Sequence, residues 1–159
     1  MPSEDLFKQY GCEIIDQPAQ PVLSIRARTR AQDLPRFLGE AYGKIAQYLG
    51  QLGEAPAGPP FCGYFNMDME NLEVEAGFPV ARALPGAGEI QFCEFPAGKA
   101  AVCVFSGPYD SMPPAYEALT QFITRQGYVP TGESYEFYLN DPMQVAPEAL
   151  STRILFPLK

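Results

Sequence analysis

The residue with the clearest potential for chemistry in this 159-residue chain is a glutamate surrounded by aromatic side chains. Glu136 stands between Tyr135 and Phe137, and Tyr138 follows two residues later. Burying a carboxylate in apolar surroundings costs free energy unless the group is paired with a partner or reaches water. Two interpretations follow. Glu136 lies on a solvated strand face, or it is a pocket anion that pairs with a cation while the neighbouring rings supply cation–π contact.

A second pair of carboxylates, Glu73 and Glu75, alternates in the segment NLEVEAGFPV. Successive side chains of a strand point to opposite faces, so these two share one face. Paired carboxylates can perform acid–base chemistry. The same pattern is typical of any exposed strand face, which is the favoured interpretation here.

Several other kinds of site are excluded by composition. The chain contains no histidine, which removes Ser-His-Asp and Cys-His catalysis and histidine ligands to metals or haem. No pair among the four cysteines (Cys12, Cys62, Cys93, Cys103) has CxxC spacing, so no zinc or redox motif is predicted. Between Val102 and Val104, Cys103 is expected to be a core residue. No glycine-rich stretch matches a nucleotide-binding loop. We therefore expect neither a metal nor a cofactor.

Charge and hydropathy limit the partners. The chain is 47% hydrophobic and 19% charged, which predicts a folded domain. Its net charge of −8 and the absence of a basic stripe argue against nucleic-acid binding. It has neither an apolar run long enough to span a membrane nor a signal-peptide pattern at its start. We therefore expect a cytoplasmic protein with no membrane partner.

Two amphipathic helices must position these residues. Apolar residues recur at three- and four-residue spacing over residues 34–52 and again over residues 112–123. Gly53 and Gly127 end the two patterns. Asp110 or Ser111 is expected to cap the second helix, with Pro113 and Pro114 in its first turn.

The helices belong to an internal repeat. An offset of 74 residues carries Ala41, Tyr42 and Ile45 onto Ala115, Tyr116 and Leu119, and it carries Gly53 onto Gly127. The same offset carries Phe61 onto Tyr135 and Tyr64 onto Tyr138, so Cys62 corresponds to Glu136. Matches at this many positions without a gap indicate a duplicated unit.

Each copy predicts the order strand, helix, strand, strand. The strands are expected at 21–28, 60–66 and 72–80, and again at 99–105, 134–140 and 151–158. Two extra strands are expected at 12–17 and 89–95, each just before its copy, with residues 83–88 as the hinge. We predict one α+β domain over residues 1–159, with repeats at about 12–82 and 89–158. Its two main helices cover one face of an antiparallel sheet, and a ligand cleft lies between the modules.

Strand alternation divides the aromatic segment into two faces. We expect Tyr135, Phe137 and Leu139 to face the helix, which leaves Glu136 and Tyr138 on the opposite face. In the first copy, Phe61, Gly63 and Phe65 would face the helix, and Cys62 and Tyr64 would point away from it.

The segments FPAGKAA, SGPYD, YEFYLNDP and LEVEAGFPV make the chain similar to a known family. It resembles the GyrI-like small-molecule-binding domain, which is the effector-binding domain of some AraC- and MerR-type multidrug regulators. The resemblance extends from about Glu13 to Leu158. The duplication agrees with the paired modules of that family. Ser106 departs from the family pattern, because many relatives have a histidine before GPY.

The resemblance implies a binding function. Such domains bind lipophilic, often cationic and aromatic compounds, with a buried glutamate as counter-ion, and Glu136 matches that glutamate. Glu75 matches a second acidic position. Tyr64 and Tyr138 are the expected aromatic walls, with Cys62 on the same face. The chain has no helix-turn-helix segment, so we expect a stand-alone member that senses or sequesters small molecules without binding DNA directly.

Two alternatives remain. Some stand-alone relatives hydrolyse reactive cyclopropane-bearing genotoxins, and this chain could do so with Glu136 as general base and Tyr64 or Tyr138 as donor. Other relatives inhibit DNA gyrase through a protein–protein contact. The acidic charge fits that role, but the charges here are scattered along the chain and form no block.

Overall fold

The computed structural model describes residues 2–95 and 97–159. The chain divides into two compact units. One combines Met1–Gln17 with Gly98–Lys159, and the other is Pro18–Ala97. We call them the Glu136 unit and the Glu75 unit after the acidic residue that each contains, and each is described by itself.

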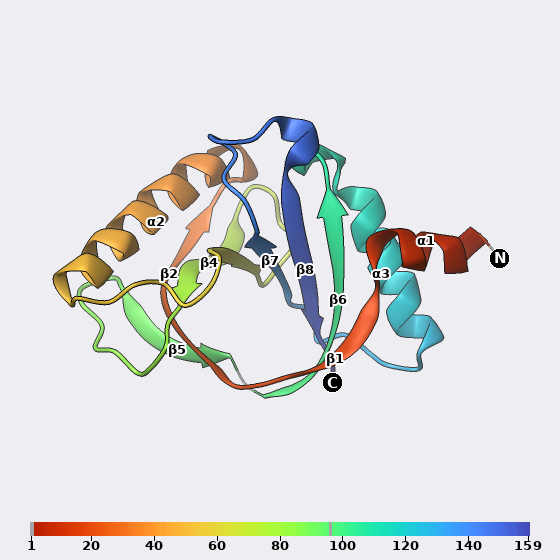
Figure 1. Cartoon of the computed structure of the whole chain (residues 1–159), viewed down its shortest axis with the longest axis horizontal. Helices are drawn as coiled ribbons and strands as arrows, with labels where there is room; N and C mark the ends of the chain where they lie inside the picture. Colours follow the sequence, from red (N-terminus) through yellow and green to blue (C-terminus); the bar gives the residue numbers. More distant parts are fainter. Residues whose placement is uncertain (1, 96) are drawn as a thin grey trace. The chain divides into compact units, whose positions relative to one another are not determined.

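The Glu136 unit is a four-stranded antiparallel sheet in the order β1-β6-β8-β7. Its strands are β1 (Glu13–Gln17), β6 (Gly98–Ser106), β7 (Ser134–Tyr138) and β8 (Ser151–Pro157). Its helices are α1 (Pro2–Tyr10) and α3 (Pro113–Arg125), with short 3-10 turns η2 (Tyr109–Ser111) and η3 (Pro147–Ala149). Helix α3 packs on β6 and β8, and α1 packs on α3 (Figure 1).

The Glu75 unit has the same plan in the strand order β5-β2-β4-β3. Its strands are β2 (Gln20–Thr29), β3 (Phe61–Tyr64), β4 (Leu72–Pro79) and β5 (Gln91–Phe95). Helix α2 (Leu34–Gln51) follows the short turn η1 (Ala31–Asp33) and packs on β2 and β4 (Figure 1). The predicted α+β class, with antiparallel sheets and helices on one face, is confirmed.

The register of the strands shows how closely the two units match. Val22 pairs with Pro79 in one unit, and Ala100 pairs with Pro157 in the other, so a single offset of 78 residues carries one pair onto the other. The offset of 74 carries Ala41, Ile45 and Leu49 of α2 onto Ala115, Leu119 and Ile123 of α3, and all six are buried in the cores beneath their helices. The predicted internal repeat is therefore present in the packing as well as in the sequence.

The two extra strands were predicted by position alone, and the structure shows which strands they pair with. Strand β1 precedes the first copy in sequence, but it pairs with β6 of the second. Strand β5 precedes the second copy, but it pairs with β2 of the first. Residues 83–88, expected as a hinge between the copies, lie inside the Glu75 unit. Each copy thus completes its sheet with the strand that lies before the other copy in the sequence.

The ends of the helices follow the sequence in part. Gly53 and Gly127 have φ of 70° and 81°, the left-handed conformation that ends a helix and that glycine adopts without strain. The predicted cap of α3 is wrong, because Asp110 and Ser111 lie in η2 and Met112 is the N-cap, without a side-chain cap bond. Helix α1 was not predicted, and its Phe7 packs edge-on against Phe122 of α3 at 5.3 Å. None of the helices in the described part of the chain is long and apolar enough to cross a membrane.

Candidate functional site

Glu136 lies on the helix-covered face of its sheet, contrary to the prediction. Side chains of directly opposed residues in an antiparallel pair project to the same face. Glu136 is opposite Ile154, a residue fully buried in the core beneath α3. The hydroxyl of Tyr116, on α3, donates a hydrogen bond to the Glu136 carboxylate. Tyr138 is on the same face, and Tyr135 and Phe137 are on the other.

The same correction applies to the Glu75 unit. Cys62 is opposite Ala76, and Tyr64 is opposite Val74, on the face where Ala76 packs beneath α2. Cys62 and Tyr64 therefore lie on the helix-covered face. Phe61 and Gly63, expected to face the helix, are on the other face.

The Glu136 carboxylate is the centre of a group of three tyrosines. Tyr138 donates a hydrogen bond of 2.9 Å to Oε1, and Tyr116 donates to Oε2. The ring of Tyr109, in η2, meets the ring of Tyr138 edge-on with centroids 5.6 Å apart. Glu136, Tyr116 and Tyr138 are half-buried, and Tyr109 is 41% exposed. We call Glu136 and these tyrosines the Glu136 cluster.

The electrostatics of Tyr109 reflect the nearby carboxylate. Burial raises the pKa of Tyr109, and the negative charges of Glu136 and Asp141 raise it further. Both effects disfavour a second negative charge at this position. The cluster is therefore a partly desolvated place of negative potential, where a cation would be stabilised.

A buried hydroxyl adjoins the cluster. Thr152 on β8 is directly opposite Tyr138 and therefore shares its face. Its side chain is fully buried, and its Oγ1 has no hydrogen-bond partner within the described residues. Leaving a buried polar atom unpaired costs about 1–3 kcal/mol. A ligand group or a water that reached this hydroxyl would recover part of that cost.

The duplication shows that the carboxylate belongs to one copy alone. Tyr42 on α2 corresponds to Tyr116, and its hydroxyl donates to the backbone carbonyl of Phe61 at 2.8 Å. The residue that corresponds to Glu136 is Cys62, which is fully buried. The helix tyrosine is common to both units, whereas the acidic group it contacts is specific to the Glu136 unit. This difference between the copies makes Glu136 a candidate for function rather than for the shared fold.

Glu75 occupies a different kind of position. It lies on the face of β4 turned away from α2, only 3% exposed, and accepts a hydrogen bond of 2.6 Å from Ser24. Arg26 lies 3.8 Å away, with its guanidinium 4.3 Å from the centre of the Phe65 ring. The expectation of an exposed face is wrong for Glu75. Glu73 shares its face as predicted and pairs with Arg28 at 2.9 Å.

The structure therefore brings two of the predicted site residues, Glu136 and Tyr138, into direct contact. Cys62, Tyr64 and Glu75 belong to the other unit, with Glu75 on the opposite face of its sheet from Cys62 and Tyr64. Tyr116 and Tyr109 were missed as members of the site. The signal for Tyr116 was its hydroxyl on an apolar helix face, because a buried tyrosine hydroxyl usually has a hydrogen-bond partner.

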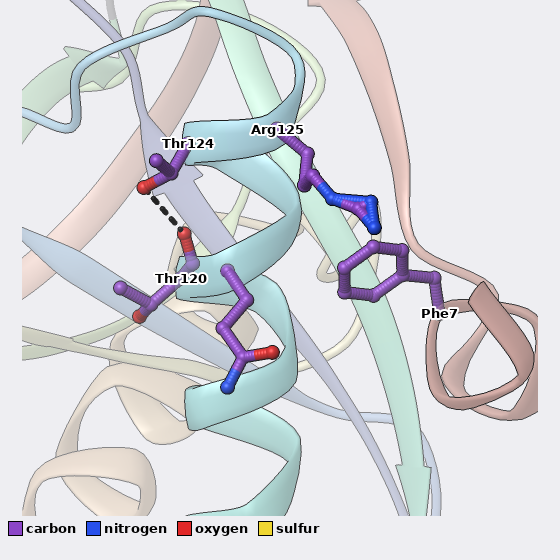
Figure 2. Close-up of a pocket in the computed structure, with 5 residues that line it drawn as sticks. Phe7, Thr120, Thr124 and Arg125 are labelled. Carbon is purple, nitrogen blue, oxygen red and sulfur yellow. Dashed lines mark hydrogen bonds between the residues drawn. The ribbon is translucent and has the colours of Figure 1, made fainter. Parts of the chain in front are cut away.

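A separate pocket of about 330 Å³ lies at the contact of α1 with α3. It is lined by Phe7, Thr120, Gln121, Thr124 and Arg125. Figure 2 shows Phe7 and Arg125 pointing toward one another. It also shows the hydrogen bond of 3.2 Å that the Thr124 hydroxyl donates to the backbone carbonyl of Thr120. The pocket contains no carboxylate and shares no residue with the Glu136 cluster.

A family model for the GyrI-like small molecule binding domain matches residues 11–159. The chain belongs to this family. The match covers nearly all of both units, and small-molecule binding is the general property of this family of domains. No protein of curated function matches its sequence.

Solved structures share the fold. A structure of an EcmrR–DNA complex has a TM-score of 0.80 at 24% identity, and the match covers 98% of this chain and 62% of EcmrR. The GyrI-like chain thus spans less than two thirds of that protein. The EcmrR C-terminal domain alone gives a TM-score of 0.70 at 25% identity, with 94% of this chain and 98% of that domain covered.

Two further solved structures share the fold at lower sequence identity. A hydrolase from Listeria innocua has a TM-score of 0.68 at 16% identity, and the match covers 93% of this chain and 91% of that one. SAV2435 bound to tetraphenylphosphonium has a TM-score of 0.67 at 12% identity, with 93% of each chain covered. At these identities the likeness concerns the fold.

Proposed function

We propose that the Glu136 cluster binds lipophilic, cationic aromatic small molecules. The observation that carries this proposal is a half-buried carboxylate held by two tyrosine hydroxyls beside a third tyrosine ring. The carboxylate is the counter-ion, and the rings supply apolar surface and cation–π contact. Tyr64, Cys62 and Glu75, which the sequence also predicts as ligand contacts, stay predictions.

The two hydrogen bonds prepare the carboxylate for this role. These hydrogen bonds fix the orientation of the carboxylate and replace part of the hydrogen bonding to water that it loses through burial. The electrostatic attraction between the carboxylate and a bound cation is stronger in this partly desolvated site than it would be at the open surface.

Two other observations support a cationic ligand. The net charge of −8 attracts cations and repels anions over the whole surface. SAV2435, which has the same fold, binds tetraphenylphosphonium, an aromatic cation with no hydrogen-bond donor. A ligand of that kind is held by charge and ring contacts, which the Glu136 cluster provides. Such a site tolerates many ring systems, as sensing or sequestration of varied compounds requires.

The proposal is tested by two probes of nearly the same shape and opposite charge. Tetraphenylphosphonium and tetraphenylborate are titrated into the protein by isothermal calorimetry at low and physiological salt. We expect saturable binding of the phosphonium at both salt concentrations and none of the borate. Equal binding of the two would show that apolar contact alone selects the ligand. Phosphonium binding that vanishes at physiological salt would assign it to surface charge, and either result would overturn the proposal.

A second candidate function is hydrolysis of a reactive small molecule at the same cluster. It is favoured by the contact of Glu136 with Tyr116 and Tyr138, because a carboxylate beside phenols can accept a proton from water while a phenol polarises the electrophile. A binder returns an electrophilic cyclopropane compound unchanged, whereas a hydrolase converts it to the water adduct. Chromatography of the compound after incubation with protein in less than stoichiometric amount distinguishes the two.

A further inference from the structure

Two cysteines that are distant in sequence face each other across β1 and β6. Glu13 pairs with Val102 in the antiparallel register, so the next step of that register sets Cys12 opposite Cys103. Both side chains contribute to the core beneath α3, Cys103 as a buried member and Cys12 packed against it. Register and packing thus agree in placing the two sulfurs together.

The two thiols differ in access to solvent. Cys12 is partly exposed, just before the first residue of β1. Cys103 is fully buried, with its Sγ 4.0 Å from the carbonyl oxygen of Ala115 on α3. A reagent in solution can therefore reach Cys12, whereas Cys103 is reached through Cys12.

The backbone at this position suits a disulfide. Opposed residues of an antiparallel pair have Cα atoms about 4.5–5.5 Å apart. Disulfides span Cα separations of about 4.4–6.8 Å. Cys12 lies just outside the ladder, and its backbone N–H donates a hydrogen bond of 2.9 Å to the Phe7 carbonyl.

The two thiols also differ in the direction in which their pKa is shifted. Interaction with the Cys103 thiol lowers the pKa of Cys12, against the opposing effect of burial. The pKa of Cys103 is raised, by the interaction with Cys12, by burial and by the negative charge of the Cys12 thiolate. The thiolate is the nucleophilic form of cysteine. Cys12 is thus the attacking thiol, and Cys103 is the thiol that follows.

We propose that Cys12 and Cys103 are a peroxide-reactive thiol pair that closes to an intramolecular disulfide between the N-terminal segment and β6. The Cys12 thiolate attacks one oxygen of hydrogen peroxide, an S–O bond forms, the O–O bond breaks, and hydroxide leaves. That hydroxide takes the Cys103 proton. The Cys103 sulfur then attacks the Cys12 sulfur, the S–S bond forms, and the S–O bond breaks to release a second hydroxide. This hydroxide is neutralised by the proton that Cys12 lost on ionisation.

The steps balance. Two thiols lose two electrons in total, peroxide gains them, and the products are one disulfide and two waters. Oxidation of Cys12 to the neutral sulfenic acid also removes the negative charge that holds the proton on Cys103. The first step therefore prepares the second.

The test uses the full chain treated with stoichiometric hydrogen peroxide, alkylated, and digested with trypsin. Cleavage after lysine and arginine sets the four cysteines in separate peptides, 9–26, 45–82, 83–99 and 100–125. We expect one linked product, peptide 9–26 joined to peptide 100–125 with the loss of two hydrogens. A product linked through Cys62 or Cys93, or intermolecular dimers in place of the internal link, would overturn the proposal.

Variants separate the two roles. In Cys103→Ala, the oxidation of Cys12 should stop at the sulfenic acid, which dimedone traps on peptide 9–26. In Cys12→Ser, Cys103 should stay reduced. Cys93→Ser is the matched control and should form the link as the wild type does. Circular dichroism verifies that each variant is folded. If Cys103 is oxidised as fast in Cys12→Ser as in the wild type, the order of attack proposed here is wrong.

Discussion

Glu136→Gln is expected to weaken the binding of tetraphenylphosphonium by roughly 5- to 150-fold, which corresponds to about 1–3 kcal/mol. Glutamine keeps the shape of the side chain and removes its charge. One of the two hydroxyls, from Tyr116 or Tyr138, can still donate to the amide oxygen, and the other can accept from the amide NH2, so both tyrosines keep a hydrogen bond to residue 136. The loss therefore reports the attraction between carboxylate and cation. Isothermal calorimetry of the two proteins measures it.

Two comparisons separate this effect from a general change of charge. Glu117→Gln alters the net charge equally on an exposed position of α3, next to Tyr116 in sequence, and should leave the affinity unchanged. Triphenylphosphine oxide, which is neutral and carries three of the four phenyl groups, should bind Glu136→Gln and the wild type with similar affinity. If Glu117→Gln weakens binding as much as Glu136→Gln does, the carboxylate of Glu136 has no specific role.

Gly77→Ala is expected to lower the free energy of unfolding by about 2–4 kcal/mol. Gly77 on β4 is opposite Ser24 on β2, where the strands approach closely. A Cβ at this position would lie 2.2 Å from the backbone carbonyl oxygen of Leu23 and 2.8 Å from the Ser24 Cβ. Backbone must therefore move to admit one methyl group. Because Ser24 donates to Glu75, that movement also disturbs a buried hydrogen bond.

The matched control is a glycine where the same methyl group has space. Gly43 lies within α2 and has no atom within 4 Å of the position its Cβ would take. Alanine is favoured over glycine in a helix, so Gly43→Ala should raise the free energy of unfolding by about 0.5–1 kcal/mol. Urea titrations followed by circular dichroism compare the variants. A Gly77→Ala protein that unfolds with the wild type would contradict the close approach of β2 and β4.

Much of the fold was predictable because the apolar spacing and the duplication report the same elements twice. The stripe of Ala41, Ile45 and Leu49 faces its core, as does the corresponding stripe of α3. The partners of the extra strands were not predictable in this way. The sequence predicts strands at 12–17 and 89–95, but it does not show which neighbour each one joins. Helix α1 was missed because its nine residues give only a short periodic pattern.

The candidate site was predictable in its residues and not in its orientation. Alternation establishes that Glu136 and Tyr138 share a face, but both faces of β7 carry aromatic rings, so alternation does not identify the face toward α3. The prediction placed Tyr135, Phe137 and Leu139 toward the helix, and alternation then turned the carboxylate away from it. In the structure the carboxylate faces the helix and accepts a hydrogen bond from the Tyr116 hydroxyl. These two residues are 20 positions apart in the sequence, and the periodicity of a strand gives no information about such a contact.

The most direct test of the central claim is to locate a bound cation by crystallography. Tetraphenylarsonium has nearly the shape of tetraphenylphosphonium, and the anomalous scattering of its arsenic atom marks its position without reference to the rest of the electron density. We predict one strong anomalous peak beside the Glu136 carboxylate, with the phenyl groups against Tyr109 and Tyr138, and a clearly weaker peak in Glu136→Gln crystals soaked at a concentration near the wild-type Kd. A peak elsewhere, such as the pocket lined by Phe7 and Arg125, with none at Glu136, would contradict the claim.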